Sequence, residues 1–189
     1  EVVVIPGKGA RASVRAHIGG KKGQLGIHNV GTLKGNEVQL SADGNLYSLA
    51  INQGGLVDAK VVRGEGGAIV FARETKAEEA VLVSAERLHV EGKVLAPKIE
   101  VQADRHIEVS GEVEGTQIAM ISQGTMKVGS KINLAEGGAV VLGSADMHPG
   151  RSICHASIKH LLDRGDVTLE TTGNELIVGK HVTREHPEL

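Results

Sequence analysis

Acidic side chains are the residues of this sequence whose number and spacing come closest to a catalytic arrangement. Paired carboxylates cleave glycosidic bonds by acting as general acid and as nucleophile or base. These acids, however, alternate with Arg or Lys and with apolar positions, as solvent-facing residues of a strand do. With one Tyr, one Phe and no Trp, the chain also lacks aromatic platforms for a sugar. We therefore predict a solvated face, no catalytic residues and no enzyme. The acids are Glu74, Glu78, Glu79, Glu86, Glu91, Glu100, Asp104, Glu108, Glu112 and Glu114.

Nine histidines and one cysteine raise the question of a metal site, which needs three or four converging ligands. His155 and His160 lie near Cys154, but residues five apart on a helix diverge by about 140°. His89 and His106 fall near equivalent positions of a repeat, which favours stacking on the surface. A lone Cys154 excludes an internal disulfide and a thiolate metal site. We predict no metal and no cofactor.

Arg164, Gly165 and Asp166 form an integrin-type tripeptide, and they are the candidate adhesion site of this sequence. A structural interpretation competes with it. Gly165 would end a helix, Asp166 would begin a strand, and Arg164 would lie at the negative end of the helix dipole. We favour the structural interpretation, because short motifs often occur by chance.

A short apolar pattern that recurs at intervals of about 19 residues indicates which elements position these side chains. Val94, Val113 and Ile132 have this spacing, and each follows a glycine by two or three positions. The earlier pair Val38 and Val57 has the same spacing. Such a period predicts a solenoid, in which each repeat buries its apolar face by stacking on the next. We expect Val94, Val113 and Ile132 to form one inward ladder.

Short alternating runs rich in Val and Ile predict strands with one buried face. Asp43-Gly44 is the one pair typical of a two-residue hairpin turn, so the chain gives little sign of reversal. A parallel β-helix with turns about 4.8 Å apart fits better. The scarcity of aromatic residues and the 26 glycines fit a narrow core with glycine corners. We predict a single all-β domain over residues 1–189.

Two segments interrupt this pattern. Residues 45–52 are expected to form a short insertion or an irregular turn. Residues 152–164 are expected to form one short helix, with Ser152 as N-cap and Gly165 as its stop. Ile153, Ala156, Leu161 and Leu162 would lie on one face of it. Strands would return at 167 and 177, and the polar tail 181–189 would fray.

Charge and hydropathy narrow the classes of partner. The formal net charge is −2, with 21 basic and 23 acidic residues, so no basic patch dominates. Nucleic-acid binding is therefore not expected. No apolar run reaches about 18 residues, so we expect no membrane insertion. Because the chain begins with Glu1, we expect it to be a segment of a longer protein.

Four stretches resemble filamentous haemagglutinin-like bacterial exoproteins. Residues 44–52 resemble the line G-N-x-Y-A-L-A-I-N, with Ser48 in place of the usual alanine, and residues 27–33 resemble a recurrent I-x-N-x-G-x-I turn. Residues 66–70 resemble a G-G-x-V strand start, and residues 153–169 a helix-then-strand line. The resemblance implies a right-handed parallel β-helix, secreted or at the bacterial cell surface, exported by two-partner secretion through an outer-membrane transporter. The Asn-Pro-Asn-Gly line is missing, so the chain corresponds to a portion downstream of the start of the export domain.

We therefore expect a structural or adhesive, non-catalytic segment of such an exoprotein. Its expected partners are a neighbouring β-helical module or a second copy end to end, and a host-cell or surface receptor. End-to-end pairing follows from the open strand edges of a coil, and residues 2–5 show no evident cap at the first edge. A bactofilin-like cytoskeletal β-helix polymer and a polysaccharide lyase-type β-helix are the alternatives.

Overall fold

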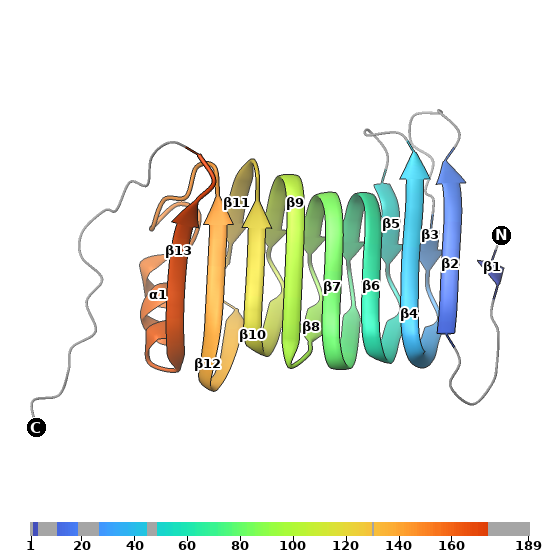
Figure 1. Cartoon of the computed structure of the whole chain (residues 1–189), viewed down its shortest axis with the longest axis horizontal. Helices are drawn as coiled ribbons and strands as arrows, with labels where there is room; N and C mark the ends of the chain where they lie inside the picture. Colours follow the sequence, from blue (N-terminus) through green and yellow to red (C-terminus); the bar gives the residue numbers. More distant parts are fainter. Residues whose placement is uncertain (1, 4–10, 19–26, 45–48, 130, 174–189) are drawn as a thin grey trace, which may run out of the picture.

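The computed structural model describes residues 2–3, 11–18, 27–44, 49–129 and 131–173. These residues wind into one elongated coil of short strands (Figure 1). In this view the chain ascends in front, crosses over the top, descends behind and advances to the left, which makes the coil right-handed. The predicted all-β, right-handed parallel β-helix with about 19 residues per turn and one short helix is confirmed.

The described strands form a 13-stranded sheet, and every pairing in it is parallel except that of β1 with β2. The elements are β1 (Val2–Val3), β2 (Arg11–Ile18), β3 (Ile27–Asn29), β4 (Thr32–Gly44), β5 (Leu49–Gln53), β6 (Leu56–Phe71), β7 (Glu74–Val90), β8 (Lys93–Leu95), β9 (Lys98–Val109), β10 (Glu112–Ser122), β11 (Thr125–Val128), β12 (Ile132–Ser144), α1 (His155–Leu162) and β13 (Gly165–Thr171).

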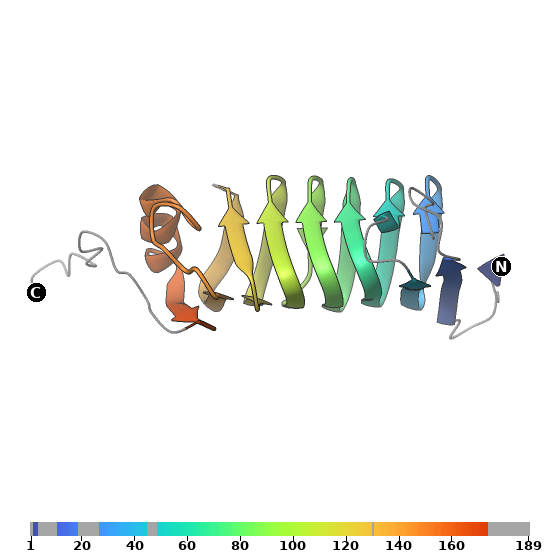
Figure 2. The ribbon, with the colours of Figure 1, turned by 90° about the horizontal axis from the view of Figure 1, so that it is seen from above.

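Each regular turn contributes a segment to three faces, and the long strands bend around the corners between them. The first face contains 80–85, 98–103, 117–122 and 139–144, and it ends at β13. The second contains β5, 69–71, 88–90, 107–109 and β11. The third contains 56–59, 74–77, β8, 112–114 and 132–134. Figure 2 shows the turns following one another along the axis.

Inward side chains of successive turns stack into ladders that make up the core. On the third face, Val113 pairs with Val94 on one side and with Ile132 on the other. All three are at most 2% exposed. The parallel-strand spacing puts each side chain about 4.8 Å from the next, within van der Waals reach. The predicted inward ladder is therefore the arrangement of these three residues in the structure.

Glycines occur at the corner before this ladder because neighbouring turns approach too closely there for a side chain. A Cβ on Gly111 would clash with the carbonyl oxygen of Gly92, and one on Gly92 would clash with that of Arg73. The recurrence of glycine in the repeat thus reflects backbone-to-backbone packing between turns.

An early turn of the coil is longer than the later ones, which corrects one prediction. Val38 pairs with Val62 on the first face, whereas Val57 pairs with Leu33 on the third. Val38 and Val57 therefore belong to different faces, and the match between their spacing and the later repeat is accidental. The true period here is 24 residues, as between Asn29 and Gln53, whose side chains are hydrogen-bonded. Both valines are nevertheless buried.

The prediction of an insertion or irregular turn at residues 45–52 is wrong for residues 49–52. Residues 49–53 form β5, which pairs in parallel with β3 and β6. Ile51 is fully buried in the second face, between Ile27 and Ile69. Residues 45–48, including Tyr47, lie outside the described residues. Residues 49–52 are thus part of a rung of the coil.

The helix is shorter than expected and begins later. It spans His155–Leu162 with Cys154 as N-cap. Ser152 is not the cap, because its hydroxyl accepts a hydrogen bond from the His148 N–H (3.1 Å) and donates one to the Asp146 carbonyl (3.2 Å). These two bonds close the loop before the helix and use the groups that would cap it.

The buried face of α1 also differs from the prediction. Ser157, Ile158 and Leu161 are buried, whereas Ala156 is exposed. Ile153 precedes the helix and forms a parallel bridge with Val128, so it continues the second face. Gly165 begins β13 and does not end the helix.

The two ends of the coil differ from each other. At the first end, the predicted uncapped edge is paired over two residues, since Val2 and Val3 pair antiparallel with Val14 and Ser13 of β2. At the other end, α1 packs against β12 and β13 (Figure 1). The tail 181–189 and the strand expected at 177 lie outside the described residues.

One buried hydroxyl offers a test of the ladder. Thr75 is fully buried between Val57 and Val94, and its Oγ1 has no hydrogen-bond partner among the described residues. An unsatisfied buried polar group costs about 1–3 kcal/mol. We expect Thr75→Val, which keeps the shape, to raise the free energy of unfolding by about 1 kcal/mol in urea denaturation. Thr75→Ala is the control, because it also loses a methyl group. A loss of stability in Thr75→Val would show that the hydroxyl has a partner.

Candidate functional site

Several acidic side chains on the outside of the coil are paired with bases. Lys93 Nζ lies 3.3 Å from a carboxylate oxygen of Glu112 and 3.3 Å from one of Glu114. The hydrogen bonds that Lys93 donates to these two carboxylates raise its pKa. Lys98 and Glu100 lie 2.8 Å apart in the same manner. The pairs are exposed and contribute little stability each. Within the described part of the chain they balance charge, which fits the predicted solvated face.

Glu86 is the exception, since it is only 7% exposed. Its carboxylate lies 2.8 Å from Nε of Arg105 in the next turn. The Arg105 side chain is 62% exposed, so the pair sits at the corner between the first and second faces with its cation towards water. The contact is an ion pair between two turns, and both carboxylate oxygens of Glu86 are buried without a hydrogen-bond partner among the described residues.

His89 and His106 gather around one carboxylate on the second face. His89 is the cross-strand partner of Glu108, and His106 precedes Glu108 by two positions on the same strand. Nε2 of each histidine lies 4.0 Å from Oε2 of Glu108. The sequence predicted that the two histidines stack on each other. In the structure they do not, and each lies beside Glu108 instead. Among the described residues, no group of three or more His, Cys, Asp or Glu can hold a metal ion.

Cys154 is an exposed thiol at the first turn of α1. Its Sγ lies 2.9 Å from Oγ of Ser157. The hydrogen bond from Ser157 lowers the pKa of the Cys154 thiol, and backbone N–H groups at the helix start act in the same direction. His155 and His160 are exposed on the same helix. The arrangement favours the thiolate form of Cys154, and no metal-ligand group forms around it among the described residues.

The structure ties the tripeptide 164–166 into the sheet. Gly165 pairs with Gly138, and Asp166 pairs with Ala139. The Arg164 carbonyl accepts a hydrogen bond from the Gly137 N–H (2.8 Å). The backbone therefore cannot leave the coil without breaking pairs, and only the exposed side chains of Arg164 and Asp166 face solvent.

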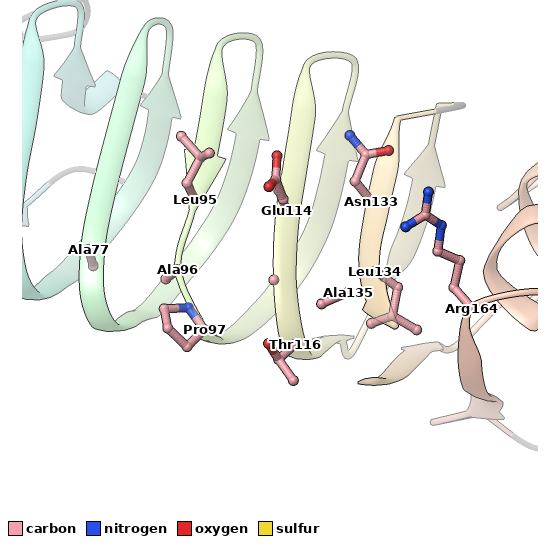
Figure 3. Close-up of a pocket in the computed structure, with 11 residues that line it drawn as sticks. Ala77, Leu95, Ala96, Pro97, Glu114, Thr116, Asn133, Leu134, Ala135 and Arg164 are labelled. Carbon is pink, nitrogen blue, oxygen red and sulfur yellow. The ribbon is translucent and has the colours of Figure 1, made fainter. Parts of the chain in front are cut away.

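A groove of about 570 Å³ lies on the surface of the described coil, and the Arg164 side chain lines it. It follows the corner between the third and first faces over successive turns (Figure 3). Its volume lies in the range of small-ligand sites. The lining residues are Ala77, Leu95, Ala96, Pro97, Glu114, Gly115, Thr116, Asn133, Leu134, Ala135 and Arg164.

Most of the lining residues are small or apolar. The two charged lining residues, Glu114 and Arg164, differ in whether they have an ion-pair partner. Glu114 is already paired with Lys93, and the Asn133 amide donates a hydrogen bond to Glu112 (2.7 Å). Among the described residues, Arg164 has no ion-pair partner. In Figure 3 its side chain extends from the junction after α1 towards Asn133 and Leu134.

Sequence reasoning identified Arg164 but missed the groove. The residues that line the groove come from separate turns and lie together only because of the register of the coil. One signal was available: Ile118 pairs with Val140, whereas the regular repeat would pair it with Gly137. The extra residues lie between Leu134 and Ala139, at the corner that forms the groove.

Comparisons of the chain with protein-family models, curated proteins and solved structures find no match. Across the described residues, no helix has the length and apolar character needed to cross a membrane.

The pKa of Cys154 leads to a testable reactivity. Below the ordinary thiol pKa, the lowered value leaves more thiolate, so iodoacetamide should alkylate Cys154 faster than a free thiol does. Ser157→Ala should slow alkylation about twofold to fivefold, since a lost hydrogen bond is worth about 0.5–1 kcal/mol. The difference should vanish at high pH, where both thiols are ionised. Thr168→Ala, on the exposed side of β13, is the control. Equal rates for Ser157→Ala and the unaltered protein at neutral pH would contradict the assignment.

Proposed function

We propose that this chain is a rigid, non-catalytic β-helical segment of a secreted or cell-surface exoprotein of the filamentous haemagglutinin type. In this role it works as a stalk that also offers an adhesive surface. The continuous inward ladders are the observation that carries the proposal. Val94, Val113 and Ile132 illustrate it, because the same chemistry repeats from turn to turn without a break.

Stacked turns produce stiffness by two means. Main-chain hydrogen bonds run between turns, roughly along the axis, and the ladders fill the interior at the same spacing. Bending such a rod requires parting hydrogen bonds on one side and compressing a packed core on the other. Each turn contacts mainly its neighbours, so length can be added or removed by whole turns. These properties suit a stalk.

The location and the adhesive role depend on the sequence resemblance. The lines at 27–33, 44–52, 66–70 and 153–169 occur in the order seen in haemagglutinin-like exoproteins. Outward positions can vary freely in such a coil, because only inward positions are constrained by the stack. A surface of this kind can acquire a receptor site without loss of the rod.

Removal of one whole turn tests the rod. Deleting residues 94–112 joins Lys93 to Val113, and Val113 then takes the place of Val94 above Thr75. We expect a folded protein with one cooperative urea transition at a moderately lower midpoint, because one repeat and one interface are lost. Deleting only residues 94–102 is the matched control, since it moves every later side chain out of register. Unfolding of both variants alike would argue against a modular rod.

Surface labelling of the bacterium that encodes the chain tests its location. An antibody against the purified protein should bind intact cells or the culture medium, while a cytoplasmic marker stays unlabelled. Staining that needs lysis and reveals filaments would instead support the bactofilin-like alternative. The purified protein should not shorten pectin or hyaluronan, because the described lining of its groove holds one carboxylate, Glu114, which is paired with Lys93. Turnover that is lost on replacement of one acid would support the lyase alternative and contradict the proposal.

A further inference from the structure

The corner groove has features that a stalk does not require. It spans several turns, it is lined by small and apolar side chains, and it ends at a cation without an ion-pair partner among the described residues. We propose that the groove binds an extended peptide segment, and that a carboxylate side chain of this peptide pairs with Arg164. This inference goes beyond the proposed function and does not depend on it.

The length of the groove matches a short extended chain. Ala77, Pro97, Thr116 and Ala135 line it, one from each of four successive turns. Three intervals of about 4.8 Å give about 14 Å, and four extended residues at about 3.3 Å each cover about 13 Å. A tetrapeptide lying along the coil axis therefore fills the groove.

The floor permits close approach of a peptide backbone. Ala77, Ala96 and Leu134 are buried beneath it, so the accessible apolar side chains of the lining are those of Leu95, Pro97 and Ala135. The Thr116 hydroxyl makes no hydrogen bond with another described residue, and it can bond a peptide group. The accessible surface of the lining is thus more polar than apolar, and it offers hydrogen-bonding groups beside a few apolar side chains.

Arg164 is the group of the groove that selects an acidic ligand. Glu114 shares Lys93 with Glu112, whereas the guanidinium of Arg164 has no ion-pair partner among the described residues. A planar guanidinium binds a carboxylate through two parallel hydrogen bonds. One cation at one end of the groove fits one carboxylate at one end of the peptide.

A peptide fits better than a glycan. None of the described lining residues is aromatic, so a sugar ring would find no platform on which to stack. A nucleic acid strand would need more than one cation and stacking side chains. An extended peptide needs neither.

Two departures from the regular repeat build the end of this groove. Residues 135–138 lie outside the register of β10 with β12, and they bulge at the corner. The Gly137 N–H donates to the Arg164 carbonyl at 2.8 Å, which fixes the junction after α1 beside the bulge. In solenoids, insertions commonly map to the binding face. Here the bulge at 135–138 and the insertion that carries α1 meet at Arg164.

A titration followed by 1H-15N correlation spectra of the whole chain tests the site. The probes are two acetylated and amidated tetrapeptides, Ala-Val-Thr-Asp and Asp-Val-Thr-Ala, because the direction of the peptide is not fixed. We expect one of them to bind with a dissociation constant on the order of 1 mM or below, as suits a small contact. The shifted amides should lie at 95–96, 114–116, 133–137 and 164. Replacement of Asp by Asn in the peptide should weaken binding about fivefold.

Matched variants separate the ion pair from general effects. Arg164→Gln should weaken the Asp peptide about fivefold and leave the Asn peptide unchanged. Arg151→Gln removes an exposed arginine outside the groove lining and should change nothing. Ala135→Tyr fills the groove from an exposed position and should abolish binding of both peptides.

Three results would overturn the inference. The first is equal binding of the Asp and Asn peptides to the unaltered protein. The second is unchanged binding of the Asp peptide to Arg164→Gln, with its dispersed spectrum showing that the variant is folded. The third is a trigalacturonate probe that binds the same amides more tightly than either peptide, which would assign the groove to an acidic glycan. None of these results bears on the rod, which the turn deletion tests separately.

Discussion

The stacking of each turn on the next is the constraint on which this structure depends. A single turn has three short segments and encloses almost no volume, so it cannot bury its own inward side chains. Val113 is buried because Val94 lies on one side of it and Ile132 on the other. The same adjacency brings the backbone groups of neighbouring turns into hydrogen-bonding distance. Local sequence therefore needs only to repeat an apolar residue at the right interval, and cooperation between turns does the rest.

This constraint explains which parts of the fold were predictable from the sequence. The interval between Val94 and Val113 reports the length of a regular turn directly, so the coil and one ladder followed from it. The interval between Val38 and Val57 misled, because the turn that joins Val38 to Val62 is longer and the two earlier valines face different sides. A corner can lengthen without disturbing the ladders. Periodicity therefore predicts the inside of a solenoid well and the lengths of its corners poorly.

Helix limits and the groove were less predictable, for two different reasons. Ser152 is a good N-cap by local chemistry, but its hydroxyl bonds Asp146 and His148 within the preceding loop. A tertiary contact thus replaced a local one. The groove depends on register alone, since Thr116 and Arg164 are far apart in sequence and line the same groove only because the turns of the coil stack. A motif search finds Arg164 only as part of a tripeptide, whose backbone the sheet in fact holds.

The register of the turns fixes the inward side chains and leaves the outward side chains free to vary. This difference determines where such a rod can gain a function. On the third face, Glu74, Lys93 and Glu112 lie in adjacent turns with alternating charge, which balances the surface without creating a site. A regular column of this kind offers the same chemistry at every turn and cannot distinguish one position from another. Specific recognition therefore requires a break in the repeat. In this chain the bulge at 135–138 and the insertion that carries α1 both supply such a break, and the Gly137 to Arg164 hydrogen bond joins them. Departures from the period are thus where a solenoid of this type can acquire a binding site while its core stays unchanged.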